Sequence, residues 1–325
     1  MAGPSGSQGA YACPAILRRV STLALITTYL LIVLGSTVRV THSGMGCRSW
    51  PLCDGHLAPL DNFHSAIEQY HRYGAAIVSV LVYYTGFLAW RHCRHQRRVF
   101  IPAVISCGVI LLQVGLGALT VLTHNAPVTV GMHLLGGVLE LGIVTVVAIT
   151  AHGKALYQSD RVFPSSGVAK SAVVRWSLLA VLATLGIIIT GSIVVNSHAA
   201  QACPQWPFCS YGAAPARLVD FQYLHRATVL VGGLLLLVFF VRAWNGWRSL
   251  GVGPLIVVDI ALFGIQVVAG ALSAVLRAPA DIQDLHLAIA ALFWAGIIAL
   301  VSMAWDRTSN LERANGDREF RVLEK

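Results

Sequence analysis

Charged residues are scarce in this chain, and their scarcity excludes an ordinary soluble domain. Only 11% of its 325 residues are Asp, Glu, Lys or Arg, and the mean hydropathy is +0.69. A soluble domain usually contains about 25% charged residues. Because 56% of the residues are hydrophobic, the composition indicates a membrane protein.

Eight apolar runs are each long enough to cross a bilayer, which takes about 20 helical residues. The first run lacks a small-residue cleavage site where a signal peptide would need one, so we expect it to remain as a span. The predicted fold class is an all-α membrane protein with eight transmembrane helices. The runs lie near residues 20–40, 66–90, 100–122, 129–151, 172–195, 222–243, 252–276 and 284–304.

The basic residues predict how the chain is oriented in the membrane. If the N-terminus is cytoplasmic, most Lys and Arg residues, including those of the turn 91–98, fall on the cytoplasmic side, as the positive-inside rule requires. We therefore expect a multi-pass protein of the cell (plasma) membrane with both termini in the cytoplasm. The net charge of +9 then reflects orientation and attraction to anionic lipid. It makes the lipid bilayer, and not nucleic acid, the expected partner.

Cysteine is also rare, and four of the seven cysteines form two similar loops. Residues 47–53 read CRSWPLC and residues 203–209 read CPQWPFC. Both loops fall on the outer side, where oxidising conditions let disulfides persist; a metal site and a redox-active pair are the alternatives. Cys13, Cys93 and Cys107 lie on the cytoplasmic side or in the membrane, and we expect unpaired thiols there. The disulfides predicted are Cys47–Cys53 and Cys203–Cys209.

The two loops are part of a longer internal duplication. His71-Arg72 recurs as His225-Arg226, and His133 recurs as His286. Spans 1–4 and 5–8 therefore look like copies of one unit, and an even number of spans gives both copies the same orientation. We expect two tandem parallel four-helix-bundle repeats. The predicted boundaries are a disordered N-terminus at 1–17, repeats at 18–151 and 172–305, a linker at 152–171 and a disordered tail at 306–325.

Histidine inside a membrane is costly and marks function by default. Four histidines lie about one turn inside the outer starts of the even-numbered spans, two in each repeat. Two imidazoles that face each other across a bundle are the axial ligand set of a six-coordinate haem, whereas zinc would need a tighter cluster of three or four ligands. The alternative for each is a hydrogen-bonded interior side chain. The candidate iron ligands are His71, His133, His225 and His286.

Other polar residues near these histidines have two interpretations each. Arg72 and Arg226 are candidate partners for anionic haem propionates, or they extend to the lipid headgroups. His42 and His198 lie beside the Cys loops and are predicted to be surface residues.

The two copies differ at acidic positions. Glu68 corresponds to Gln222, and it lies three residues before His71, on the same helical face. A carboxylate there can accept a proton or stabilise positive charge, which an amide cannot do. The first site is therefore predicted to be reactive and the second passive, unless Glu68 only makes hydrogen bonds. Glu140, seven residues after His133, is left as either a proton relay or a partner of a buried polar group.

With these motifs the chain resembles the haem A synthase family over roughly residues 18–305. The matching motifs are GSTVRVTHSG at 35–44, the E-x-x-H-R pattern from Glu68, and the later histidines. The resemblance implies an enzyme, an oxidoreductase that converts the C8 methyl group of haem O to the formyl group of haem A through an alcohol. It implies haem b between His225 and His286, substrate haem O between His71 and His133, and catalysis by Glu68.

The resemblance also implies a supply of haem A for terminal cytochrome oxidase, with a haem O synthase and an electron acceptor as partners. An outer disulfide in the first half is common in that family and matches Cys47 and Cys53, whereas a second pair is not universal. The sequence leaves the electron acceptor, the origin of the formyl oxygen and the state of homo-oligomerisation open.

Two other classes of protein compete with this interpretation. A di-haem b-type electron carrier linked to quinol commonly has two histidines on one helix and haems stacked across the membrane, whereas here each helix has one and all four lie near the outer face. A transporter built from parallel repeats would need a polar cavity at mid-membrane and broken helices, whereas these spans are apolar and largely uninterrupted.

Overall fold

The computed structural model describes residues 13–57, 62–157, 170–212 and 214–323 of the chain. Over these ranges it is all-helical, and eight helices are long and apolar enough to cross a membrane. The predicted fold class is confirmed in this respect, and the protein is a multi-pass membrane protein. The helices are α1 (Ala15–Val40), α2 (Phe63–Cys93), α3 (Arg97–Leu122), α4 (Pro127–Tyr157), α5 (Lys170–Asn196), α6 (Ala216–Trp247), α7 (Gly253–Val275) and α8 (Ala280–Leu323).

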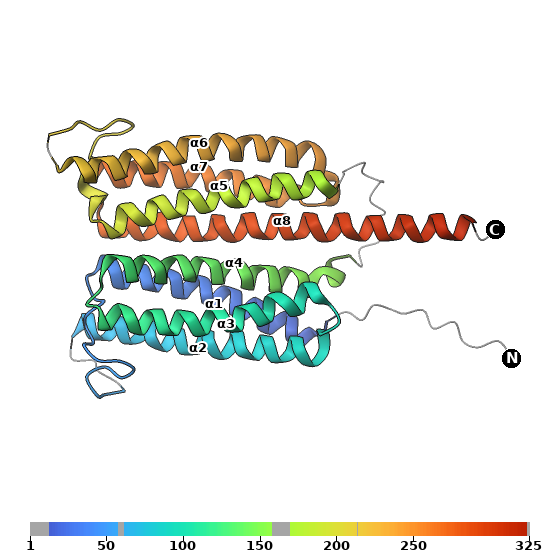
Figure 1. Ribbon diagram of the computed structural model, residues 1–325, viewed down its shortest axis with the longest axis horizontal. Coiled ribbons are helices and arrows are strands. Elements are labelled where there is room, and N and C mark those ends of the chain that lie inside the picture. The colour runs from blue at the N-terminus through green and yellow to red at the C-terminus, as the bar shows by residue number, and fades with distance from the viewer. Residues whose placement is uncertain (1–12, 58–61, 158–169, 213, 324–325) are drawn as a thin grey trace.

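The helices form two groups of four that lie side by side (Figure 1), with α1–α4 in one group and α5–α8 in the other. The connections that contain the Cys loops lie at the end opposite to the two termini. Helices α4 and α8 meet where the groups join: the Trp294 indole donates to the Val138 carbonyl at 2.8 Å, and Gly142 leaves room for the ring. An origin of the two groups by duplication stays a prediction.

Each odd-numbered helix ends near the Cys-loop end in a residue with positive φ. One such residue follows α1 (His42) and one follows α5 (His198), whereas two follow α3 (His124 and Asn125) and two follow α7 (Arg277 and Ala278). The chain then folds back so that a later N–H bonds an earlier carbonyl, as the Ser43 N–H does with the Val38 carbonyl at 2.8 Å. His42 and His198 are exposed, as expected, and they end helices by adopting the left-handed conformation.

The chain ends differ from the sequence prediction. Residues 1–12 of the predicted disordered N-terminus lie outside the described residues, whereas α1 already begins at Ala15. The sequence predicts a disordered tail, whereas in the structure α8 continues past the apolar run and remains helical to Leu323. The Asp306 carboxylate at the start of this extension pairs with Arg98 at 3.1 Å. Most of the predicted linker, residues 158–169, is outside the described ranges, and α4 extends to Tyr157.

The prediction of unpaired thiols was wrong for two cysteines. Cys13 and Cys93 form a disulfide with their Cα atoms 6.0 Å apart. Helices α1 and α2 are antiparallel neighbours, so the start of one lies beside the end of the other and the two cysteines meet there. Cys107 is the free cysteine within the described part of the chain.

Candidate functional site

All four predicted histidines lie in the Cys-loop half of the bundles, partly buried, and each contacts a glycine on the preceding helix. A Cβ atom added at these glycines would come within 2.9 to 3.3 Å of the Cε1 atom of the imidazole. Real Cβ atoms rarely approach so closely, so glycine is what allows each ring to lie between its helices. The four contacts are Gly35–His71, Gly117–His133, Gly191–His225 and Gly270–His286.

The structure brings His71 of α2 and His133 of α4 together. Their ring centroids are 6.4 Å apart and the ring planes are 83° apart. Two metal–nitrogen bonds of about 2 Å and two ring radii of about 1 Å give nearly the same separation. The pair therefore fits a single iron atom between two imidazoles.

The second pair, His225 of α6 and His286 of α8, has polar neighbours from the odd-numbered helices. The His225 Nδ1 atom lies 3.0 Å from Thr190 Oγ1, and the His286 Nε2 atom lies 3.3 Å from Gln266 Nε2. The two imidazoles are close enough to interact electrostatically. The second group of helices thus also provides two histidines, but with polar neighbours that the first pair lacks, since the Nδ1 atoms of His71 and His133 are buried without a hydrogen-bond partner among the described residues.

Glu68 lies beneath the first Cys loop and is only 4% exposed. Its Oε2 atom accepts from the Cys47 backbone N–H at 2.8 Å, and its Oε1 atom pairs with Arg72 at 2.6 Å. Arg72 also donates to the loop carbonyls of Ser49 and Pro51, at 2.8 and 3.3 Å. The carboxylate is therefore held in a fixed orientation between the loop and α2.

The second Cys loop is held in a similar way, but without an acid. Arg226 donates to the carbonyls of Gln205 and Pro207 at 2.8 and 3.0 Å. Gln222 donates through Nε2 to the Ala199 carbonyl at 2.8 Å, whereas Glu68 accepts from the backbone. The substitution of an amide for the acid therefore reverses the direction of the hydrogen bond and removes the charge. Both loops contain the predicted disulfides, Cys47–Cys53 and Cys203–Cys209.

Two further acids lie inside the helical groups, away from the histidines. Glu140 is 1% exposed and accepts from Ser106 Oγ at 2.5 Å. Asp259, which the sequence analysis missed, is fully buried, and neither carboxylate oxygen has a partner among the described residues. An isolated acid within a 23-residue apolar helix was the signal that could have found it.

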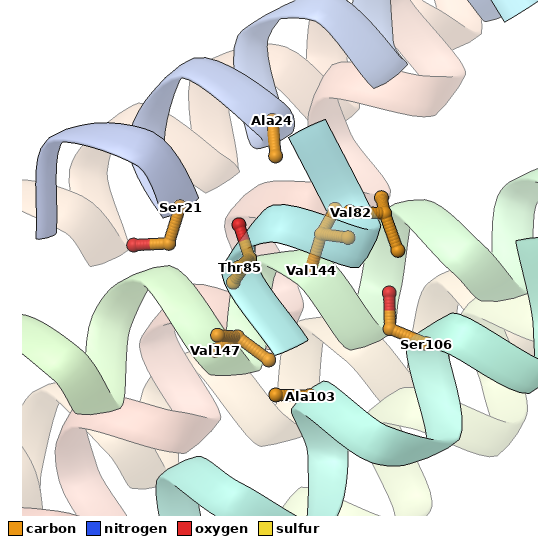
Figure 2. A pocket seen from close by; sticks show the side chains of 8 residues that line it. All are labelled: Ser21, Ala24, Val82, Thr85, Ala103, Ser106, Val144 and Val147. Carbon is orange, nitrogen blue, oxygen red and sulfur yellow. The ribbon is translucent and has the colours of Figure 1, made fainter. Parts of the chain in front are cut away.

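A small cavity between α1, α2, α3 and α4 is separate from the histidine pairs. Ser21, Thr85 and Ser106 lie on its wall together with valine and alanine side chains (Figure 2). Thr85 is 14 residues after His71, which corresponds to about 21 Å along the helix. The cavity therefore does not belong to the candidate haem site.

The fold and the site define a multi-pass membrane protein with paired histidines inside its helical groups. The family model for cytochrome oxidase assembly protein, COX15-CtaA, matches residues 18–70 and 61–298. The chain belongs to this family, which confirms the resemblance seen in its motifs.

Curated relatives extend over most of the chain. A heme A synthase of Shouchella clausii (strain KSM-K16) is 30% identical over 264 residues, which cover 78% of this chain and 86% of that protein. Another of Bacillus mycoides (strain KBAB4) is 27% identical over 304 residues, covering 90% and 96%. One of Bacillus cereus (strain AH187) is 26% identical over 309 residues, covering 91% and 97%.

Proposed function

We propose that this protein is a haem A synthase that oxidises the C8 methyl group of haem O to a formyl group through an alcohol. The observation that carries the proposal is the His71–His133 pair, whose ring centroids are 6.4 Å apart, together with the buried acid Glu68, which lies three residues before His71 on α2. Membership of a family whose relatives are named heme A synthase supports the same reaction.

The two histidine pairs are assigned different roles. His71 and His133 flank the substrate haem O, and His225 and His286 hold haem b. The glycines beside the imidazoles support ligation at both pairs, and the acid Glu68 in the first half against the amide Gln222 in the second supports the difference in role. A haem bound in the second half supplies one-electron chemistry. The electron acceptor is a separate partner on the outer side.

Glu68 acts on the substrate. Removal of electrons from a carbon attached to a porphyrin builds positive charge at that carbon. A carboxylate whose oxygens are already oriented by Cys47 and Arg72 stabilises this charge without reorganising and accepts a released proton. Gln222 cannot do either, so the second site retains its haem unchanged.

The rival function is a di-haem b-type electron carrier. An electron carrier would have no need for an acid (Glu68) in one half and an amide (Gln222) in the other. The four histidines also lie at one end of the helices, so haems bound there would make a poor path for electrons across the membrane. The alternative that Glu68 only orders the Cys loop is favoured by its hydrogen bond to Cys47, so the test must separate structure from chemistry.

Haem extraction and mass analysis tests the proposal. The chain and its Glu68→Gln variant are expressed with a haem O synthase in a host that makes no haem A. We expect haem A or the alcohol from the wild type, and only haem O from the variant, with haem b retained in both. Unaltered haem O in the wild type, where a known synthase succeeds, would leave the electron carrier as the better interpretation.

A further inference from the structure

Arg39 is an arginine near the Cys-loop end of α1 whose hydrogen-bonding capacity is only partly used. Its Nη1 atom donates to Gln283 Oε1 of α8 at 3.1 Å. Its Nε atom is buried and has no hydrogen-bond partner in the described part of the chain. Asp284 is close enough to interact electrostatically, but it does not take up this donor. Leaving a buried donor unpaired is costly, so Arg39 has an open position for an acceptor from outside the chain.

The position of Arg39 relates it to the first histidine pair. It lies four residues after Gly35, the glycine that contacts His71. Residues four apart share a helical face and are about 6 Å apart along the axis. The backbone of Arg39 therefore lies one turn beyond Gly35, toward the end of the bundle where the Cys loops are, and its guanidinium extends to Gln283 at the start of α8.

The other two arginines near the histidines are already occupied. Arg72 pairs with Glu68 and donates to carbonyls of the first loop, and Arg226 donates to carbonyls of the second. The position that corresponds to Arg39 in the second half is Val195, by the same spacing that relates the two Cys loops. The second half therefore has no arginine at the position equivalent to Arg39.

We propose that Arg39 binds a propionate carboxylate of the haem substrate through its unpaired Nε–H. This inference rests on the proposed function, because it takes the His71–His133 site to be the one that binds haem O. A carboxylate is the acceptor that a guanidinium prefers. The contact fixes which edge of the macrocycle faces the Cys-loop end and therefore which methyl group faces Glu68. Arg39 is in this sense a positioning residue.

The test compares haem O with its dimethyl ester, in which both propionates lose their charge. Purified full-length protein with haem b retained is titrated with each compound without an electron acceptor, so that only binding is measured. A charge-assisted hydrogen bond is worth about 1.5–3 kcal/mol, so the wild type should bind the free acid at least about tenfold more tightly than the ester. Arg39→Gln should bind both equally, and Arg39→Lys should lie between them. Arg48→Gln, which removes an exposed cation of the first loop, is the matched control and should behave as the wild type.

The comparison separates a binding contact from a structural role. A variant that only disturbs the helices would lose the same factor for the acid and the ester, and this result would overturn the proposal. Unchanged affinity for the free acid in Arg39→Gln would also overturn it. Retained haem b reports that each variant is folded. Because no oxidation is measured, failure of the haem A synthase proposal would leave a difference between acid and ester unaffected.

Discussion

Four glycines decide how close the histidine-bearing helices come to their neighbours. At Gly270 a Cβ atom would lie 2.9 Å from the Cε1 atom of His286, whereas at Gly264 of the same helix nothing lies within 4 Å. The two positions differ in their surroundings and share the same helix. Alanine substitutions at the two positions therefore distinguish a loss of space at the imidazole from the general effect of alanine on the helix.

We predict that Gly270→Ala displaces the His286 ring and lowers the haem b content of the purified protein severalfold. Gly264→Ala should keep the haem and, because alanine favours helices over glycine by about 1 kcal/mol, should unfold at the same or a slightly higher temperature. Haem content by absorbance and unfolding by circular dichroism provide the two measurements. Equal haem content in both variants would show that the close contact has no role in ligation.

Single residues were predicted unevenly. The four histidines could be found from the sequence because an imidazole inside an apolar run has no ordinary reason to be there. Arg39 was not singled out, because an arginine at the end of a span usually extends to the headgroups. Its guanidinium donates through Nη1 to Gln283, which is 244 positions away and cannot be placed beside Arg39 by sequence pattern.

At the scale of helices, apolar length determined which segments became spans, and all eight were predicted. The ends of the helices were predicted less well, because hydropathy indicates which residues lie in the bilayer and does not indicate where a helix begins or ends. Helix α2 starts at Phe63, where Asn62 caps it by accepting from the Ser65 N–H. Helix α8 continues to Leu323 through a charged segment that water can solvate.

The Cys13–Cys93 disulfide leads to a prediction about α1 and α2. It closes a segment with a sequence separation of 80, against 6 for Cys203–Cys209. Chain entropy predicts about 4.5 kcal/mol for the longer closure and about 2.4 kcal/mol for the shorter one, and both values are upper limits for helices that stay in the membrane when unfolded. We expect Cys93→Ser to lower the midpoint of thermal unfolding more than Cys209→Ser does.

Peptide mapping after alkylation, with and without prior reduction, shows whether the bond is present in purified protein. Alkylation of Cys13 and Cys93 before reduction would contradict the bond. In that case the Cys93→Ser variant should unfold at the temperature of the wild type, and Cys209→Ser should have the larger effect.

At the scale of the whole molecule, the proposed orientation places the Cys loops outside and both termini in the cytoplasm. Labelling of intact cells with a membrane-impermeant maleimide tests it. A cysteine introduced at Ser210, beside the second loop, should react, whereas one at His95, in the turn between α2 and α3, should react only after the cells are broken. The reverse pattern would place the histidine pairs near the cytoplasm. Labelling of the unsubstituted protein provides the background from Cys107.

The pairing of each imidazole with a glycine on the preceding helix has a consequence for biogenesis. Both partners belong to one helical hairpin, such as α1–α2 or α7–α8, and a hairpin can enter the bilayer as a unit. Each hairpin would then arrive with its half of a pocket already shaped, before any second hairpin is present. The His71–His133 pair forms only when the first two hairpins dock, so capture of a macrocycle would come late, after insertion, and would lock together hairpins that had entered the membrane separately.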